Sequence, residues 1–169
     1  FPNEKGKPYK SSGGAMVFNQ ELEKEIPEGW EVNQISNLCQ ITSSKRIFEY
    51  EYVSEGIPFF RAGEIRQKKE GKSIEDPIFI SEERFNEISV VYGYPKEGEI
   101  LLTAIGSALG DSYLVRNEKF YFKDGNVVWF KNYQIEYINL FIYQFLNSFL
   151  FKEILAEITG GSGQSAISI

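Results

Sequence analysis

The chain has 169 residues, and 42% of them are hydrophobic and 15% aromatic, which is enough apolar material for a folded core. It contains 18 basic and 24 acidic residues, a single cysteine (Cys39) and no histidine. This composition excludes an internal disulfide, a histidine-based metal site, a serine–histidine–aspartate triad and an imidazole general base.

The sequence also has no apolar run of membrane-spanning length and no visible signal peptide. One free cysteine fits a reducing compartment, so we expect a cytoplasmic protein with no membrane partner. The chain begins at Phe1 rather than Met, and it stops just after a new pattern has started. These ends predict a piece of a longer protein.

The beginning of the chain predicts an arm followed by a short helix. Residues 1–15 are rich in Gly, Pro, Lys and Ser, a composition typical of an extended linker. Asn19 is placed to cap a helix that runs to Glu25. Alternating apolar and polar residues then predict short strands over 30–35 and 38–42.

The middle of the chain predicts loops around two further strands. Residues 43–46 are polar and predict a loop, and the aromatic-rich stretch after them is compatible with a helix. Residues 57–65 predict a strand interrupted at Gly63. Residues 66–73 offer nothing to bury, which predicts a loop, and 77–80 predict a brief strand.

Ser81 is expected to begin a helix. Glu82 and Glu83 fall in its first turn, where the helix dipole favours acidic side chains, so we interpret them as helix-start charges rather than acid–base catalysts. Phe85 and Ile88 are one turn apart and predict the inner face of this helix.

The strand predicted over 99–105 is apolar almost throughout, which indicates a central strand covered on both faces. Residues 106–110 follow it with two glycines that bracket small side chains. Such a loop lets backbone N–H groups approach a bound molecule, although a tight connection into the next strand is the commoner reason for isolated glycines. A phosphate-binding loop requires Lys followed by Ser or Thr after the glycines, and Asp111 and Ser112 occupy these positions instead. The sequence therefore argues against such a loop.

The remaining chain predicts three strands and one long helix. The strands are expected over 112–116, 120–122 and 126–130, with the last two joined as a hairpin by the Lys-Asp-Gly turn at 123–125. Apolar residues recur at spacings of three and four over 137–158, a stripe more typical of core packing than of a cofactor site. The whole pattern predicts an α+β fold with a mixed, largely antiparallel sheet, a few helices and a long C-terminal helix.

The formal net charge of −6 is unevenly distributed along the chain. Residues 42–72 hold seven basic and five acidic residues, a net charge of +2, whereas residues 73–100 hold two basic and seven acidic residues, a net charge of −5. A local basic excess can form a DNA-facing edge, although a solvated surface is the commoner interpretation.

Several landmarks in a fixed order resemble the target-recognition domain of type I restriction-modification specificity subunits. They are IPEGWEV at 26–32, the Leu-Cys pair at 38–39, ITSSK at 41–45, IPFFRAGEI at 57–65, ISEE at 80–83, the turn, strand and loop of 95–110, and GSGQ at 161–164. The arm over residues 1–22 resembles the connector before such a domain. Two loops depart from the usual pattern, because a Gly is more usual than Ser44 and many relatives carry an Asn-Gln pair in the 122–128 stretch.

The resemblance implies a non-catalytic, sequence-specific DNA reader that serves phage defence. Such subunits carry two recognition domains separated by spacer helices, and each domain reads one half of a bipartite target in the major groove. Two methyltransferase subunits bind the spacer region, and restriction-translocase subunits join the complex. The resemblance divides this chain into a connector (1–25), a target-recognition domain (26–160) that ends in the long helix, and the start of the spacer helix (161–169). It implies no cofactor and no metal.

The candidate DNA contacts are the basic residues of the loops and two short polar side chains. Arginine can bind guanine through two hydrogen bonds, whereas lysine holds phosphate without reading sequence. The candidates for base edges are Arg46, Arg61 and Arg66; those for phosphates are Lys45, Lys68, Lys69 and Lys123; and Ser107 and Gln164 are candidates for phosphate or adenine edges. For each basic residue alone, a solvated surface position remains an alternative.

Two other functions remain open at this stage. The domain resembles the small DNA-reading domain of some adenine-N6 methyltransferases, but the sequence has neither an Asn/Asp-Pro-Pro-aromatic run nor a glycine-rich cofactor turn. The second alternative is a protein-interaction or scaffolding module without base reading, which docks through the apolar face of the long helix.

Overall fold

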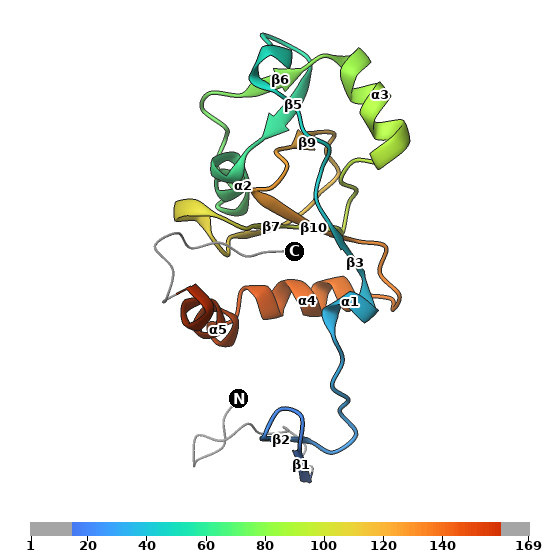
Figure 1. Ribbon diagram of the computed structural model, residues 1–169, viewed down its shortest axis with the longest axis vertical. Coiled ribbons are helices and arrows are strands. Elements are labelled where there is room, and N and C mark those ends of the chain that lie inside the picture. The colour runs from blue at the N-terminus through green and yellow to red at the C-terminus, as the bar shows by residue number, and fades with distance from the viewer. Residues whose placement is uncertain (1–14, 160–169) are drawn as a thin grey trace. The chain divides into compact units, whose positions relative to one another are not determined.

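Figure 1 shows the computed structural model of the chain, which describes residues 15–159. The chain separates into two compact units, one up to Gln34 and one from Ile35 onward. The predicted arm over residues 1–15 lies almost entirely outside the described residues, as does the GSGQ stretch at 161–164.

The first unit contains an antiparallel hairpin of β1 (Met16–Asn19) and β2 (Lys24–Pro27). The helix predicted from Asn19 to Glu25 is therefore wrong. The Asn19 carboxamide does accept a hydrogen bond from the backbone N–H of Leu22 (2.9 Å), but this bond closes a turn instead of starting a helix. The strand predicted over 30–35 is also absent, and a short helix, α1 (Ile35–Leu38), occupies its end.

The second unit contains two four-stranded sheets. The first sheet is antiparallel, and its strands lie in the order β3 (Gln40–Thr42), β10 (Val127–Lys131), β7 (Ile100–Thr103) and β8 (Ser112–Leu114). The second sheet has the order β4 (Tyr52–Val53), β6 (Ile78–Ile80), β5 (Ile57–Phe60) and β9 (Tyr121–Phe122), with β5 and β9 parallel. The predicted α+β class and the largely antiparallel pairing are confirmed.

Strand β7 is interior and buried along its whole length, as its apolar sequence predicts. Its Leu101 side chain and Trp129 of β10 pack with aromatic residues of the second sheet and its flanking loop, Phe60, Phe120 and Phe122. The opposite face of the first sheet packs against the buried side chains of α4 (Ile138–Leu146). Figure 1 shows α4 on one side of this sheet and the second sheet on the other.

Helix α3 (Glu82–Tyr92) covers part of the second sheet through Phe85 and Ile88, as predicted. Ser81 caps this helix by accepting a hydrogen bond from the backbone N–H of Arg84 (3.1 Å). The strand predicted over 77–80 is confirmed as β6. The aromatic-rich stretch before the second sheet contains one 3₁₀ turn, η1 (Glu49–Glu51).

The strand predicted over 57–65 ends at Phe60, and helix α2 (Ala62–Lys69) follows it. The loop predicted over 66–73 is consequently wrong for its first four residues. The carboxylate of Glu64 accepts a hydrogen bond from the backbone N–H of Arg61 (2.8 Å), which completes a capping box at the start of α2. This local bond starts a helix in a segment without a clear apolar stripe.

Two predictions for the end of the chain are also wrong. Strands β9 and β10 do not form a hairpin, because the turn between them carries the chain from the second sheet to the first. The long helix is divided into α4 and α5 (Phe149–Thr159). The Asn147 amide bonds the Ser112 hydroxyl (2.8 Å) at the break, and the Ser148 hydroxyl accepts from the Phe151 N–H (3.2 Å).

Within residues 15–159, no helix combines the length and apolar character needed to cross a bilayer. The same part of the chain has no cluster of three or more acidic or cysteine residues arranged to hold a metal ion. Cys39 is buried, and its burial raises the pKa of the thiol.

Candidate nucleic-acid interface

The glycine-bracketed loop after β7 forms a tight connection to β8 around the 3₁₀ turn η2 (Gly106–Ala108). The backbone N–H of Gly110 donates to the Thr103 carbonyl (2.9 Å), and that of Asp111 donates to the Ala108 carbonyl (2.9 Å). A Cβ on Gly110, whose φ is +82°, would lie 2.5 Å from a methyl carbon of Leu155. The left-handed backbone conformation, rather than packing, favours glycine here, because the Leu155 side chain could shift to make room for a Cβ, while Ser107 remains exposed at the tip.

Arg66 and Lys69 extend from α2 to the same carboxylate. The Nε of Arg66 lies 2.6 Å from one oxygen of Asp111, and the Nζ of Lys69 lies 2.9 Å from the other. A terminal nitrogen of Arg66 also donates to the Ser107 carbonyl. Burial by itself raises the pKa of Asp111, but the hydrogen bonds from Lys69 and Arg66 outweigh it and leave this pKa below its ordinary value.

Lys68, on the same helix, pairs with Glu118 at 2.5 Å. The Tyr113 hydroxyl of β8 donates to the same carboxylate, so Glu118 links α2 to β8. The Nζ of Lys68 lies 5.9 Å from the centroid of the Tyr113 ring, within reach of a cation–π contact. Three of the predicted DNA contacts thus fasten α2 to the first sheet.

Arg61 is held by its own helix. Its guanidinium donates to both oxygens of Glu64, with its shortest contact at 2.5 Å, and its side chain is 46% exposed. Burial alone raises the pKa of Glu64, but hydrogen bonds from the Arg61 side chain and backbone leave it lower than usual. The side-chain hydrogen bond in turn raises the pKa of Arg61.

A different arrangement surrounds the loop at 43–46, which strands β9 and β10 hold in place. The Ser43 hydroxyl donates to the Val127 carbonyl (3.0 Å), and the Ser44 hydroxyl donates to the Phe122 carbonyl (2.7 Å). The Lys45 backbone N–H donates to the Tyr121 hydroxyl (2.9 Å). These long-range bonds fix the loop and leave the Lys45 side chain exposed, with its Nζ 5.5 Å from the ring of Tyr92.

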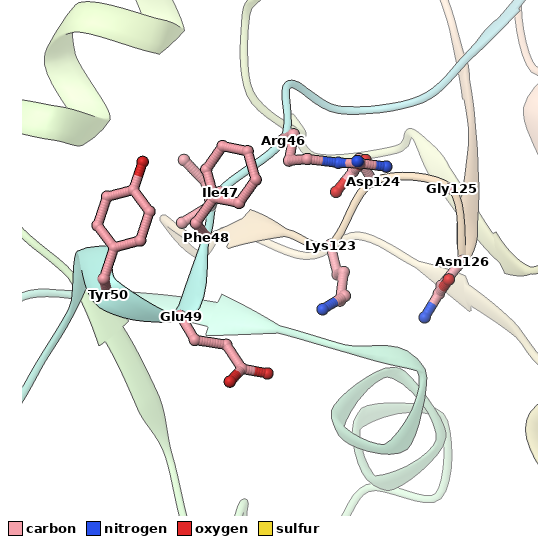
Figure 2. Close-up of a pocket in the computed structure, with 9 residues that line it drawn as sticks. All are labelled: Arg46, Ile47, Phe48, Glu49, Tyr50, Lys123, Asp124, Gly125 and Asn126. Carbon is pink, nitrogen blue, oxygen red and sulfur yellow. The ribbon is translucent and has the colours of Figure 1, made fainter.

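This loop and the turn after β9 border a surface groove of about 500 Å³, which we call the 46–126 groove; its lining residues are Arg46 to Tyr50 and Lys123 to Asn126. Arg46 pairs through its Nε with Asp124 (2.8 Å) and remains 64% exposed. Figure 2 shows Lys123 and Asn126 extending from the turn in the same direction. Within the described residues, Lys123 forms no ion pair.

Phe48 and Tyr50 form the aromatic wall of the 46–126 groove. Their rings are stacked with centroids 5.4 Å apart and an interplanar angle of 7°. The exposed fractions are 49% for Phe48 and 83% for Tyr50. The sequence prediction of DNA contacts omitted both residues and Asn126. The available signal was the density of aromatic residues over 48–52, but it does not separate the exposed Phe48 and Tyr50 from Tyr52, which packs against the core.

The structure thus separates the predicted contacts into two groups. Arg46 and Lys123 lie together at the 46–126 groove, with Lys45 on the adjoining loop. The other group lies at α2 and the loop that it touches: Arg61, Arg66, Lys68, Lys69 and Ser107. Gln164 lies outside the described residues.

Comparison with known proteins gives consistent results. The model of a family described as type I restriction modification DNA specificity domain matches residues 27–169. A putative type I restriction enzyme specificity subunit of Haemophilus influenzae is 32% identical over 121 residues, which are 71% of this chain and 29% of that protein. The specificity subunit of a type I restriction enzyme of Methanocaldococcus jannaschii is 30% identical over 163 residues, 90% of this chain and 34% of that protein.

The chain therefore spans about a third of the length of these curated relatives. Among solved structures, the S subunit of a type-I restriction-modification system from M. genitalium matches with a TM-score of 0.48 and 16% sequence identity. That match covers 76% of this chain and 28% of the other.

Proposed function

The chain belongs to the type I restriction modification DNA specificity domain family, and from this premise we propose that it recognises one half of a bipartite target in double-stranded DNA. It directs methyltransferase and restriction subunits to that target and performs no catalysis itself. Family membership is the observation that carries this proposal. The named relatives are specificity subunits of type I restriction enzymes.

The 46–126 groove is the part of the described surface that suits such recognition. Arg46 presents an exposed guanidinium whose orientation is fixed through Asp124, and its terminal nitrogens form no hydrogen bond within the described residues. Such a side chain is suited to the two acceptors on the major-groove edge of guanine. Lys123 and Lys45 flank it and serve as phosphate contacts, which fix position without reading sequence.

The basic residues of α2 have a smaller part in this proposal. Arg66, Lys68 and Lys69 already satisfy carboxylates, and a phosphate that bound them would compete with those ion pairs. Arg61 is nearly half exposed but doubly bonded to Glu64. We assign these residues mainly to the stability of the domain, with secondary contact to the DNA backbone through their exposed edges. Ser107 and Gln164 remain candidate polar contacts.

The net charge of −6 opposes the approach of DNA, so the isolated chain is expected to bind duplexes weakly at physiological salt. In the assembled complex, the methyltransferase subunits supply positive charge and additional contacts to the duplex. Tight, sequence-specific binding of one duplex by the isolated chain at physiological salt, measured by titration, would contradict this dependence on partners.

We retain the boundaries inferred from the sequence as part of the proposal: a connector over 1–25, a recognition domain over 26–160, and the start of a spacer helix from 161. The competing candidate is a scaffolding module in the same complex without base reading. It is favoured by the exposed apolar side chains of the C-terminal helices, of which Phe149 is 75% exposed and Ile158 67% exposed.

The test exchanges this domain inside a full-length specificity subunit for an unrelated recognition domain. The subunit is assembled with its methyltransferase partner, and methylated positions are mapped on a plasmid library. We expect one half of the bipartite motif to change and the other half to stay. A motif that is unaffected by the exchange would instead support the scaffolding candidate.

A further inference from the structure

The stacked Phe48–Tyr50 pair is an apolar surface held out toward solvent beside two cations. Tyr50 is 83% exposed and leaves much apolar area in water, and the parallel Phe48 ring extends that area. Neither ring belongs to a hydrophobic core cluster of the described residues. The pair is therefore available to a ligand.

Contacts with Glu51, α3 and the second sheet fix the backbone that carries the pair. The Phe48 N–H donates to one carboxylate oxygen of Glu51 (2.7 Å), and the other oxygen accepts from the Nε of Arg84 on α3 (2.7 Å). Ile47, immediately before the pair, is buried among residues of the second sheet and α3. The aromatic wall is consequently pre-formed, so ligand binding carries little conformational-entropy cost for ordering it.

The groove beside the wall suits the edges of base pairs more than a row of phosphates. Its lining contains Arg46 and Lys123, but also the carboxylates of Glu49 and Asp124, so these four charges cancel. In an intact duplex the base faces are stacked and hidden from an aromatic ring. The apolar group that base edges present in the major groove is the C5-methyl of thymine.

We propose, on the basis of the proposed function, that the Phe48–Tyr50 pair packs against the C5-methyl group of one thymine in the recognised half-site. The pair thereby makes that position specific for an A·T pair in one orientation. Arg46 and Lys123 hold the neighbouring base edge and phosphate, which brings the methyl group to the ring surface.

The experiment uses the full-length specificity subunit assembled with its methyltransferase partner, after the half-site has been mapped. Each thymine of the half-site is replaced in turn by deoxyuridine, which removes only the methyl group, and kcat/KM for methylation is measured. At one position we expect about a fourfold loss, from the transfer free energy of one buried carbon group.

The Tyr50→Ala variant is expected to methylate the thymine duplex more slowly and to show no further loss with uridine at that position. Tyr50→Phe keeps the ring and should retain the uridine effect. Tyr137→Ala removes an aromatic residue that is 71% exposed, precedes α4 and does not line the 46–126 groove, and it should behave as the wild type. Because Tyr50 is so exposed, its substitution is not expected to unfold the domain.

Three outcomes would overturn the inference. They are a half-site without any A·T pair, a wild type indifferent to uridine at every position, and a Tyr50→Ala variant with undiminished uridine sensitivity. The domain-exchange experiment described under the proposed function distinguishes a failure of this inference from a failure of the proposed function. If the exchange alters the half-site while uridine has no effect, the domain reads DNA by other contacts; if the exchange alters nothing, the proposed function itself fails.

Discussion

Substitution of Asp111 by asparagine tests whether the basic residues of α2 stabilise the fold. The Asp111 carboxylate lies 2.6 Å from Arg66 Nε and 2.9 Å from Lys69 Nζ, and it joins α2 to the start of β8. Asparagine keeps the shape and one acceptor oxygen but removes the charge. The two cations are then left with a weak neutral partner, and we expect the free energy of unfolding to fall.

The exposure of the three side chains determines the size of this effect. Charge-assisted hydrogen bonds contribute about 1.5–3 kcal/mol each when well shielded, whereas surface ion pairs contribute about 0–1 kcal/mol. The exposed fractions are 39% for Arg66, 26% for Lys69 and 20% for Asp111, which places both contacts between these limits. We expect a loss of about 1–2 kcal/mol, or roughly 2–8 °C in Tm for a chain of this size.

The same substitution predicts a pH dependence with a definite sign. The pKa of Asp111 is lower in the folded chain than its ordinary value of 3.8, so its ionised form stabilises the fold. This stabilisation is fully present at pH 7 and is lost as the pH falls through the lowered pKa of the folded state. The Tm difference between wild type and Asp111→Asn should therefore be large at pH 7 and shrink below about pH 4.

The assay is thermal unfolding followed by circular dichroism at pH 7 and at pH 3. Asp76→Asn is the matched control, because Asp76 is exposed and forms no ion pair within residues 15–159. Equal Tm values for Asp111→Asn and wild type at pH 7 would refute the reasoning. If that variant also bound DNA more tightly, Arg66 and Lys69 would be DNA contacts, as the sequence first indicated.

Three further sets of substitutions test separate parts of the structure. Gly56→Ala should cost at least about 2 kcal/mol in chemical denaturation, because φ is +144° and the new Cβ would collide with a backbone oxygen of β6, whereas Gly63→Ala in α2 meets open space and should be neutral or stabilising. Glu99→Ala leaves the buried indole N–H of Trp129 without its acceptor (2.8 Å) and should cost about 1–3 kcal/mol. Burial raises the pKa of Glu99, so Glu99→Gln should unfold at a Tm no lower than wild type at pH 7, and any gain should vanish below about pH 4.5. Lys123→Ala should slow methylation of all duplexes by a similar factor, and a change in the methylated motif would contradict its role as a phosphate contact.

Local sequence determined the elements whose causes lie within a few residues. The apolar run of β7 predicts a central strand because each of its side chains must be covered, and the structure buries them all. Ser81 and the acidic residues after it predict the start of α3 through a cap bond that spans three residues. The family was also recognisable from the order of short motifs, because those motifs are contiguous in the chain.

Tertiary structure decided the features that depend on distant partners. The predicted long helix breaks where the Asn147 amide bonds Ser112, a residue 35 positions earlier, and no helical periodicity reports such a bond. The candidate DNA contacts likewise depend on distant partners. Arg66 is paired with Asp111, 45 positions away, whereas Arg46 is oriented beside the groove by Asp124, 78 positions away. A basic residue in a sequence has a charge but no partner, and only the folded chain determines whether a carboxylate of the same chain or a DNA phosphate neutralises it.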